Sequence, residues 1–374
     1  MLINELPEDC LLTIFDYLNN LDDLINCYKV SIKWSYFISK RTKKVKYLLE
    51  GYPENGDCVS YRGTEPIDGT CLSTLFPNLK IAEISDKFAR KVKREDIVAL
   101  LKNQKSLKGL TGGYHKTPSE YCDNLEMLSF DLFKSSMQHN GSSIKQLCQV
   151  YHFARFHRYA HCFPNIERIN MQNAESHHYG VPVLEKVKIV ELCLAPWDGA
   201  DLDYCSKFMD SCPNLQSAYL VTDPVHLFVD ETIKHECLQD LAIEFDLFKK
   251  TDWDNLKRFL TKYPNLKHLR FKKIWYLKDE HIEQLVYILP NLVLFDVREC
   301  TEVTQRAADY VKDYCKRYGR SIKFYFNGNS HEIATDWPHL STKKEKISRG
   351  FDFMKHCFLK DFADLPHFLV PVDY

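Results

Sequence analysis

The sequence lacks a dominant charge and a long hydrophobic run. Its 374 residues carry 50 lysines and arginines against 51 aspartates and glutamates, so there is no basic excess to attract nucleic acid or an anionic membrane surface. The longest uncharged apolar stretch, residues 285–295, contains Pro290 and Asn291 and is too short to cross a bilayer. We therefore expect protein partners, and neither nucleic acid nor a membrane.

Dense cysteine spacing and a secretory leader are also missing. The 14 cysteines are scattered along the chain, whereas small disulfide scaffolds space them closely and in pairs. The first residues include Glu5, Glu8 and Asp9 where a leader has a basic segment and then an apolar one. These features predict reduced thiols and a cytoplasmic or nuclear location.

Sequence motifs for catalysis and metal binding are absent as well. There is no glycine-rich phosphate loop and no recognisable nucleophile motif. Potential metal ligands lie close together at Cys148, His152, His157, His161 and Cys162. Their spacing does not match a paired zinc knuckle, which favours ordinary repeat and loop residues. We expect no catalytic residue, no metal site and no cofactor.

The chain does contain the pattern of a short amphipathic helix near its start. Leu6 and Pro7 precede two carboxylates, and a helix start tolerates proline and favours acidic residues at its positive dipole end. Apolar residues then recur at helical spacing at Leu11, Ile14, Phe15 and Leu18. Asn19 and Asn20 are expected to end this helix.

Two further short helices are predicted directly after it. Leu21, Leu24, Ile25 and Tyr28 have helical spacing. Ser31 can cap a third helix, because a serine side chain accepts a hydrogen bond from a free backbone N–H. That helix would carry the apolar residues Trp34, Phe37 and Ile38. The three helices would share one small core.

This segment resembles the F-box. The positions that carry the resemblance are Leu6, Pro7, Leu11, Ile14, Phe15, Leu18, Asp23, Leu24, Val30 and Trp34. Between Val30 and Trp34 the family often has a cysteine and two basic residues, whereas this chain has Ser31, Ile32 and Lys33. The alternative interpretation of residues 5–40 is an ordinary three-helix cap on a repeat array.

The resemblance implies an F-box domain over residues 1–44 that binds a Skp-type adaptor and, through it, a cullin scaffold. A module this small buries little surface alone, so an apolar contact with a partner is physically reasonable. The adaptor-binding residues that the resemblance implies are Leu6, Pro7, Leu11, Ile14, Phe15, Leu18, Leu24, Val30 and Trp34.

Residues 45–330 repeat a strand-like unit. Apolar residues recur at positions zero, three and five of each unit. They are Leu79, Ala82, Ile84; Leu107, Leu110; Leu125, Leu128, Phe130; Ile166, Ile169, Met171; Leu184, Val187, Ile189; Leu215, Ala218, Leu220; Leu238, Leu241, Ile243; Leu266, Leu269, Phe271; and Leu292, Phe295, Val297. Pro-Asn precedes several units, and proline ends the preceding helix.

Helix-compatible segments separate the later units, at residues 252–263, 279–289 and 304–318. One strand and one helix per unit predict a leucine-rich-repeat solenoid, an α/β horseshoe with a parallel sheet on its concave face. Cys300 after Val297 matches the cysteine-containing subtype that often accompanies F-boxes. The array contains about ten units, several of which are degenerate.

In such a solenoid the residues that alternate with the leucines project from the concave sheet. They combine both charges and some aromatic groups, which suits a protein or peptide better than a small metabolite. The predicted substrate-binding residues are Tyr219, Glu244, His268, Arg270, Lys272, Asp296 and Arg298. A merely solvated sheet face is the alternative for each of them.

Residues 331–374 lack the repeat and are rich in phenylalanine. We expect this tail to cap the open end of the solenoid; the second interpretation is that it folds back over the concave face. Together the patterns predict a non-catalytic substrate receptor of an SCF-type ubiquitin ligase. A repeat scaffold without a ligase is the alternative, and an enzyme is a distant third.

Overall fold

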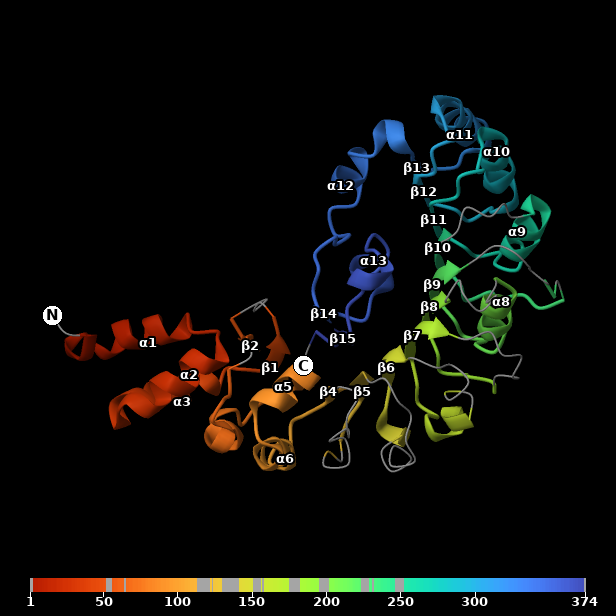
Figure 1. Ribbon diagram of the computed structural model, residues 1–374. Helices are drawn as coiled ribbons and strands as arrows, with labels where there is room; N and C mark the ends of the chain where they lie inside the picture. Colours follow the sequence, from red (N-terminus) through yellow and green to blue (C-terminus); the bar gives the residue numbers. More distant parts are fainter. Residues whose placement is uncertain are drawn as a thin grey trace. The chain divides into compact units, whose positions relative to one another are not determined.

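The computed structural model describes residues 3–51, 56–63, 65–112, 122, 124–129, 141–150, 156, 158–174, 182–194, 202–222, 229–230, 232–245 and 252–372. The chain packs as two compact units, Met1–Lys145 and Gln146–Tyr374. Each unit is described by itself (Figure 1). Over the described residues, every helix is too short or too polar to span a bilayer.

Three helices open the first unit, as the sequence predicts. They are α1 (Glu8–Asp16), α2 (Leu21–Val30) and α3 (Ile32–Thr42), after a short 3-10 turn (Ile3–Glu5). Pro7 precedes α1 at its N-cap position. The Asn20 side chain accepts from the backbone N–H groups of Asp22 and Asp23 at the start of α2, and Ser31 Oγ accepts from Trp34 N at 3.2 Å at the start of α3.

Five parallel strands follow among the described residues of this unit, in the spatial order β2-β1-β3-β4-β5. They are β1 (Tyr47–Glu50), β2 (Cys58–Tyr61), β3 (Ile81–Ile84), β4 (Gly109–Gly112) and β5 (Met127–Ser129). Helices α4 (Leu72–Leu75), α5 (Asp86–Lys91) and α6 (Arg94–Lys102) connect them. The sequence pattern did not identify β1 and β2. A backbone hydrogen bond from Ser60 N to Asn19 O, 2.8 Å, joins β2 to the helical module.

Eight described strands of the second unit pair in sequence order, and every pair is parallel. They are β6 (Gln146–Val150), β7 (Arg168–Ala174), β8 (Ile189–Leu194), β9 (Ser217–Thr222), β10 (Asp240–Phe245), β11 (His268–Lys272), β12 (Leu294–Glu299) and β13 (Lys323–Tyr325). Helices α8 (Leu202–Asp210), α9 (Trp253–Leu260), α10 (Asp279–Ile288) and α11 (Gln305–Tyr318) lie along one face of this sheet (Figure 1). This is the open leucine-rich-repeat solenoid that the sequence predicts.

The repeat frame is confirmed across the later strands and wrong in one unit. Leu241 aligns with Leu269 of β11 and with Ala218 of β9, as the apolar triplets require. In β8, however, Val190 aligns with Ile169 of β7. The predicted triplet that starts at Leu184 is therefore three residues early. Because the sequence around β8 is apolar at many positions, the repeat pattern fits it in two registers. Only pairing with the neighbouring strand decides between these registers.

The tail turns back and lies on the concave face of the second unit, opposite the helices (Figure 1). It forms α12 (Glu332–Asp336), β14 (Ile347–Arg349), α13 (Phe353–His356) and β15 (Phe368–Val370), and β14 pairs with β15 in parallel. Its apolar residues share one buried cluster with the sheet, formed by Ile189, Tyr219, Val221, Ala242, Leu294, Tyr325, Ile333, Leu340, Phe353, Met354, Cys357, Phe358, Phe362, Leu365 and Leu369. The expected cap on the open end is therefore wrong, and the fold-back interpretation describes the tail.

Candidate protein-binding surfaces

Some of the predicted adaptor-binding residues form the core of the helical module. Leu11, Phe15 and Leu24 are buried. The Phe15 ring meets the Trp34 ring edge-on at 5.1 Å and stacks with Phe37 at 6.1 Å. Leu6, Leu18 and Trp34 are half-buried. Leu11, Phe15 and Leu24 hold the helices together, so in this conformation they do not present their side chains to a partner.

The three helices and their ends carry large apolar side chains that are at least 40% exposed. This exposed apolar set consists of Ile14, Tyr17, Val30, Ile32 and Tyr36. Ile32 is 91% exposed and Tyr17 is 80% exposed, whereas side chains of this kind are normally at least partly buried. Sequence reasoning named Ile14 and Val30, together with the exposed Pro7, but missed the other three members.

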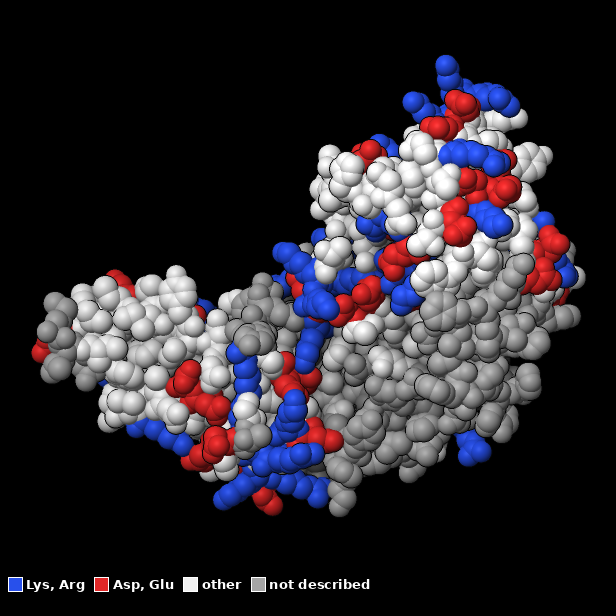
Figure 2. Space-filling model, turned by 45° about the horizontal axis from the view of Figure 1, so that its top comes forward, with Lys and Arg blue, Asp and Glu red and all other residues white. Residues whose placement is uncertain are grey.

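Spacing places members of the exposed apolar set on shared helix faces. Ile14 and Tyr17 are three residues apart at the end of α1, and Ile32 and Tyr36 are four apart on α3. Val30 ends α2 and is separated from Ile32 only by Ser31. Lys40 Nζ lies 4.4 Å from the centre of the Tyr36 ring. In Figure 2 the visible face of this module is mostly uncharged. An apolar patch with charged neighbours is typical of a protein-binding site.

The predicted substrate ladder of the second unit is largely covered. Tyr219, Glu244, Arg270, Lys272 and Asp296 are all buried, and only His268 and Arg298 remain half-buried. Their expected exposure is therefore wrong for most of the set, because the tail lies on the face toward which they point. Their part in substrate binding stays a prediction.

At the β6–β8 end of the covered face, a buried ion pair holds the tail. Arg168 and Glu191, both buried, are joined by a contact of 2.8 Å between Nη2 and Oε2. The same guanidinium donates to the carbonyl oxygens of Pro366 at 2.7 Å and His367 at 3.1 Å. Gln146 donates to Leu369 O and accepts from Leu369 N. Sequence reasoning named none of these sheet residues.

In the middle of the face, an aromatic and ionic group meets the tail. Tyr219 donates to Lys360 O at 3.2 Å, and its ring meets Phe362 edge-on at 5.6 Å. Lys272 Nζ contacts Asp361 at 2.7 Å and Glu244 at 3.1 Å. Burial would raise the pKa of Glu244, but hydrogen bonds from Lys273 and Lys272 outweigh it and lower that pKa. Glu244 is therefore a charged partner of both lysines.

Toward the last strands, Arg270 makes the main tail contacts. Its Nη1 donates to the carbonyl oxygens of Phe358 at 2.8 Å and Lys360 at 3.2 Å. On the sheet it pairs with Asp296 at 3.4 Å and Glu299 at 3.1 Å. Arg298 pairs with Asp296 instead of the tail. His268 contacts Asp240 at 2.6 Å, and its ring meets Trp337 edge-on at 5.8 Å.

Two histidines in the tail have lowered pKa values. Burial lowers the pKa of His367 to about 4, helped by Lys346 and Arg168, and burial also lowers the pKa of His356. An unfolded histidine has a pKa of about 6.5. Between those values the unfolded chain binds protons that the folded chain does not, so stability is full above pH 6.5 and falls as the pH drops.

We expect the second unit to lose up to about 3 kcal/mol of unfolding free energy between pH 7.5 and pH 4.5 through His367. Urea unfolding at several pH values measures this loss. The His356→Gln/His367→Gln variant should show a clearly flatter dependence, because glutamine does not titrate. An equally steep dependence in that variant would assign the effect to other groups.

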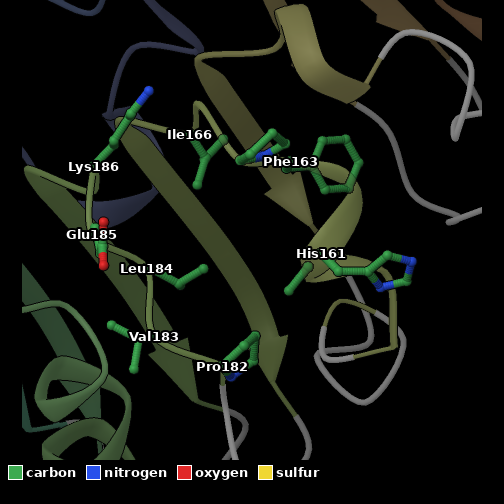
Figure 3. A pocket seen from close by; sticks show the side chains of 10 residues that line it. His161, Phe163, Ile166, Pro182, Val183, Leu184, Glu185 and Lys186 are labelled. Atoms are coloured by element: carbon green, nitrogen blue, oxygen red, sulfur yellow. The ribbon is translucent and has the colours of Figure 1, made fainter.

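A cavity of about 270 Å³ lies between the segments that precede β7 and β8 in the second unit (Figure 3). Phe163 and Ile166 line it from the turn before β7, and Val183 and Leu184 line it from the segment before β8. His161, one of the closely spaced histidines and cysteines for which the sequence favours ordinary repeat and loop residues, stands at its edge (Figure 3). His152 and His157 of that group lie outside the described residues. Among the described residues no His, Cys, Asp and Glu side chains gather closely enough to hold a metal ion.

Comparisons with known proteins gave one family match and one structural resemblance. Residues 3–42 match the family model described as F-box-like. The chain also resembles the solved structure of a leucine-rich-repeat protein of Leptospira interrogans, with 12% sequence identity and a TM-score of 0.39, over 89% of this chain and 97% of that one. No curated protein matches significantly.

Proposed function

Because this chain joins an F-box-like domain to a leucine-rich-repeat solenoid, we propose that it is a substrate-recognition subunit of an SCF-type cullin ubiquitin ligase. It binds a Skp-type adaptor through the helical module and a protein substrate through the solenoid, which promotes ubiquitination and degradation of that substrate. The observation that carries the proposal is the exposed apolar set on a domain that matches the F-box-like model.

The receptor does no bond chemistry in this proposal. It holds a substrate beside a ubiquitin-conjugating enzyme, which raises the effective concentration of the substrate's lysines. The adaptor connects it to the cullin scaffold, and the proposed location is the cytoplasm, the nucleus or both. Five uncovered apolar side chains support the adaptor contact, since burying such groups is the main source of free energy in protein association.

Replacing Tyr17 and Ile32 by aspartate should weaken binding of a purified Skp-type adaptor about 100-fold, because central apolar contacts are commonly worth 1–2 kcal/mol each or more. Isothermal titration calorimetry measures the change. Both side chains are highly exposed, so circular dichroism should show an intact fold. Leu11→Asp is a poor test, because a carboxylate at this buried position unfolds the module.

Tyr287→Asp is the matched control. Tyr287 is 72% exposed on α10 of the second unit, so this variant places one aspartate, against two in the test variant, at a similarly exposed tyrosine outside the helical module. Its adaptor affinity should equal that of the unchanged chain. Unchanged affinity in the Tyr17→Asp/Ile32→Asp variant would contradict the assignment of the adaptor contact to the exposed apolar set. An unchanged chain that does not bind the adaptor would contradict the ligase proposal and favour the repeat scaffold without a ligase.

A further inference from the structure

The concave face of the second unit holds the segment Phe358–Leu369 by hydrogen bonds to its main chain as well as by its buried side chains. Arg270 and Tyr219 donate to carbonyl oxygens near the start of the segment, and Arg168 donates to two carbonyl oxygens near its end. Gln146 bonds both the N–H and the C=O of Leu369. Carbonyl and amide groups belong to every peptide, so another chain that adopts the same turned conformation could make the same contacts.

Beside the buried Phe358, Leu365, Phe368 and Leu369, the segment places an ion pair with the sheet and a ring contact with Tyr219 on two consecutive residues. Asp361 pairs with Lys272 at 2.7 Å, and this contact lowers the pKa of the Asp361 carboxyl. Phe362 is buried against Tyr219. An acidic residue followed by an aromatic one is therefore the sequence feature of the Phe358–Leu369 segment that this face recognises.

The cations of the face already have carboxylate partners on the sheet. Arg168 pairs with Glu191, Arg270 with Asp296 and Glu299, and Lys272 with Glu244. A phosphate group carries close to two negative charges and is held by cations that are not otherwise neutralised. These pairs leave little net positive charge for a phosphate, so the face suits an unmodified peptide.

From these contacts we propose that the concave face binds an unphosphorylated peptide with an acidic–aromatic pair, in a turned conformation like that of the tail, and that Phe358–Leu369 occupies the face until such a peptide replaces it. That this peptide belongs to a ubiquitination substrate rests on the proposed function. The tail is covalently attached, and its effective concentration is therefore high. A substrate peptide competes only when it binds tightly or when the tail is loosened.

A fluorescent synthetic peptide with the sequence of residues 356–370 tests the proposal by fluorescence anisotropy on the full chain. The Asp361→Ala/Phe362→Ala variant loosens the tail, and we expect it to bind the peptide at least ten times more tightly than the unchanged chain. Asp361→Ala alone changes an exposed side chain and should raise the affinity for the peptide about threefold. This single variant provides the test if the double variant is unstable.

Lys355→Ala is the matched control, because Lys355 is an exposed tail residue outside the Phe358–Leu369 segment; it should bind the peptide as weakly as the unchanged chain. A peptide with phosphoserine in place of Asp361 should not bind more tightly. Folded variants that gain no peptide binding would overturn the proposal and make the tail a permanent part of the solenoid. A tenfold preference for the phosphopeptide would overturn the stated peptide chemistry.

The two proposals fail separately. The same tail variants should bind the Skp-type adaptor with unchanged affinity, because the exposed apolar set is not altered. If the tail variants bind the adaptor but not the peptide, only the concave-face proposal is contradicted. Peptide binding by a chain that never binds the adaptor would retain this inference and contradict the ligase proposal.

Discussion

Replacing Arg168 by methionine is expected to lower the unfolding free energy of the second unit by about 3–5 kcal/mol, the usual cost of removing one partner of a buried ion pair. The change leaves the Glu191 carboxylate buried, with Asn170 Nδ2 donating to it at 2.8 Å. It also removes the donors to Pro366 O and His367 O. Urea unfolding measures the total loss of unfolding free energy. Hydrogen exchange in β7 and β8 shows whether these strands lose protection.

The Arg168→Met/Glu191→Gln variant is the control for this prediction. Glutamine keeps an acceptor for Asn170 without a buried charge, so it should recover roughly half of the lost free energy. The tail contacts stay lost in both variants. A single Arg168→Met variant within about 1 kcal/mol of the unchanged chain would mean that Glu191 is not held as a buried carboxylate.

Deleting residues 351–374 is expected to lower the melting temperature of the second unit by about 10 °C or more. The deletion removes Phe358, Phe362 and Leu369 from the buried cluster and uncovers Tyr219 and Leu294 on the sheet. Each such side chain contributes about 1.5–3 kcal/mol of burial, of which the lost ordering entropy offsets a large part. A net loss of about 4 kcal/mol corresponds to this shift for a unit of this size.

Differential scanning fluorimetry measures that shift, and binding of a hydrophobic dye should rise as the face becomes exposed. A chain that ends after Val370 is the control, because it keeps β15 and the whole buried cluster. Adding a synthetic peptide of residues 351–374 should restore part of the melting temperature. A shift below about 2 °C would show that the tail contributes almost nothing to folding.

The helical module could be predicted because its signals are local. Pro7, Asn20 and Ser31 act within three residues of their own positions, and apolar residues three and four apart define a helix face without any knowledge of the rest of the chain. The same reasoning could not separate core from surface in detail. Leu11 and Ile14 share the apolar pattern, but only the packing of α1 against α3 decides that one is buried and the other exposed.

The strands could be predicted from the spacing of their apolar residues, but the tail that covers their concave face could not. Alternation correctly places Tyr219 and Arg270 on the face opposite the leucines, and on an isolated sheet that face would be solvated. Arg270 and Phe358 are separated by 88 residues in sequence, and no periodic pattern connects them. The abundance of phenylalanine after residue 350 indicated that the tail packs somewhere, without indicating where.

The contact between Gln146 and Leu369 spans 223 residues, and this separation has a consequence for folding in the cell. Contacts so distant in sequence form late, and a chain that emerges from the ribosome in order has its β6–β13 strands in place before Leu369 is synthesised. Until then the sheet face is open to chaperones and to other chains. A ribosome that stalls near residue 350 would release a molecule with that face open.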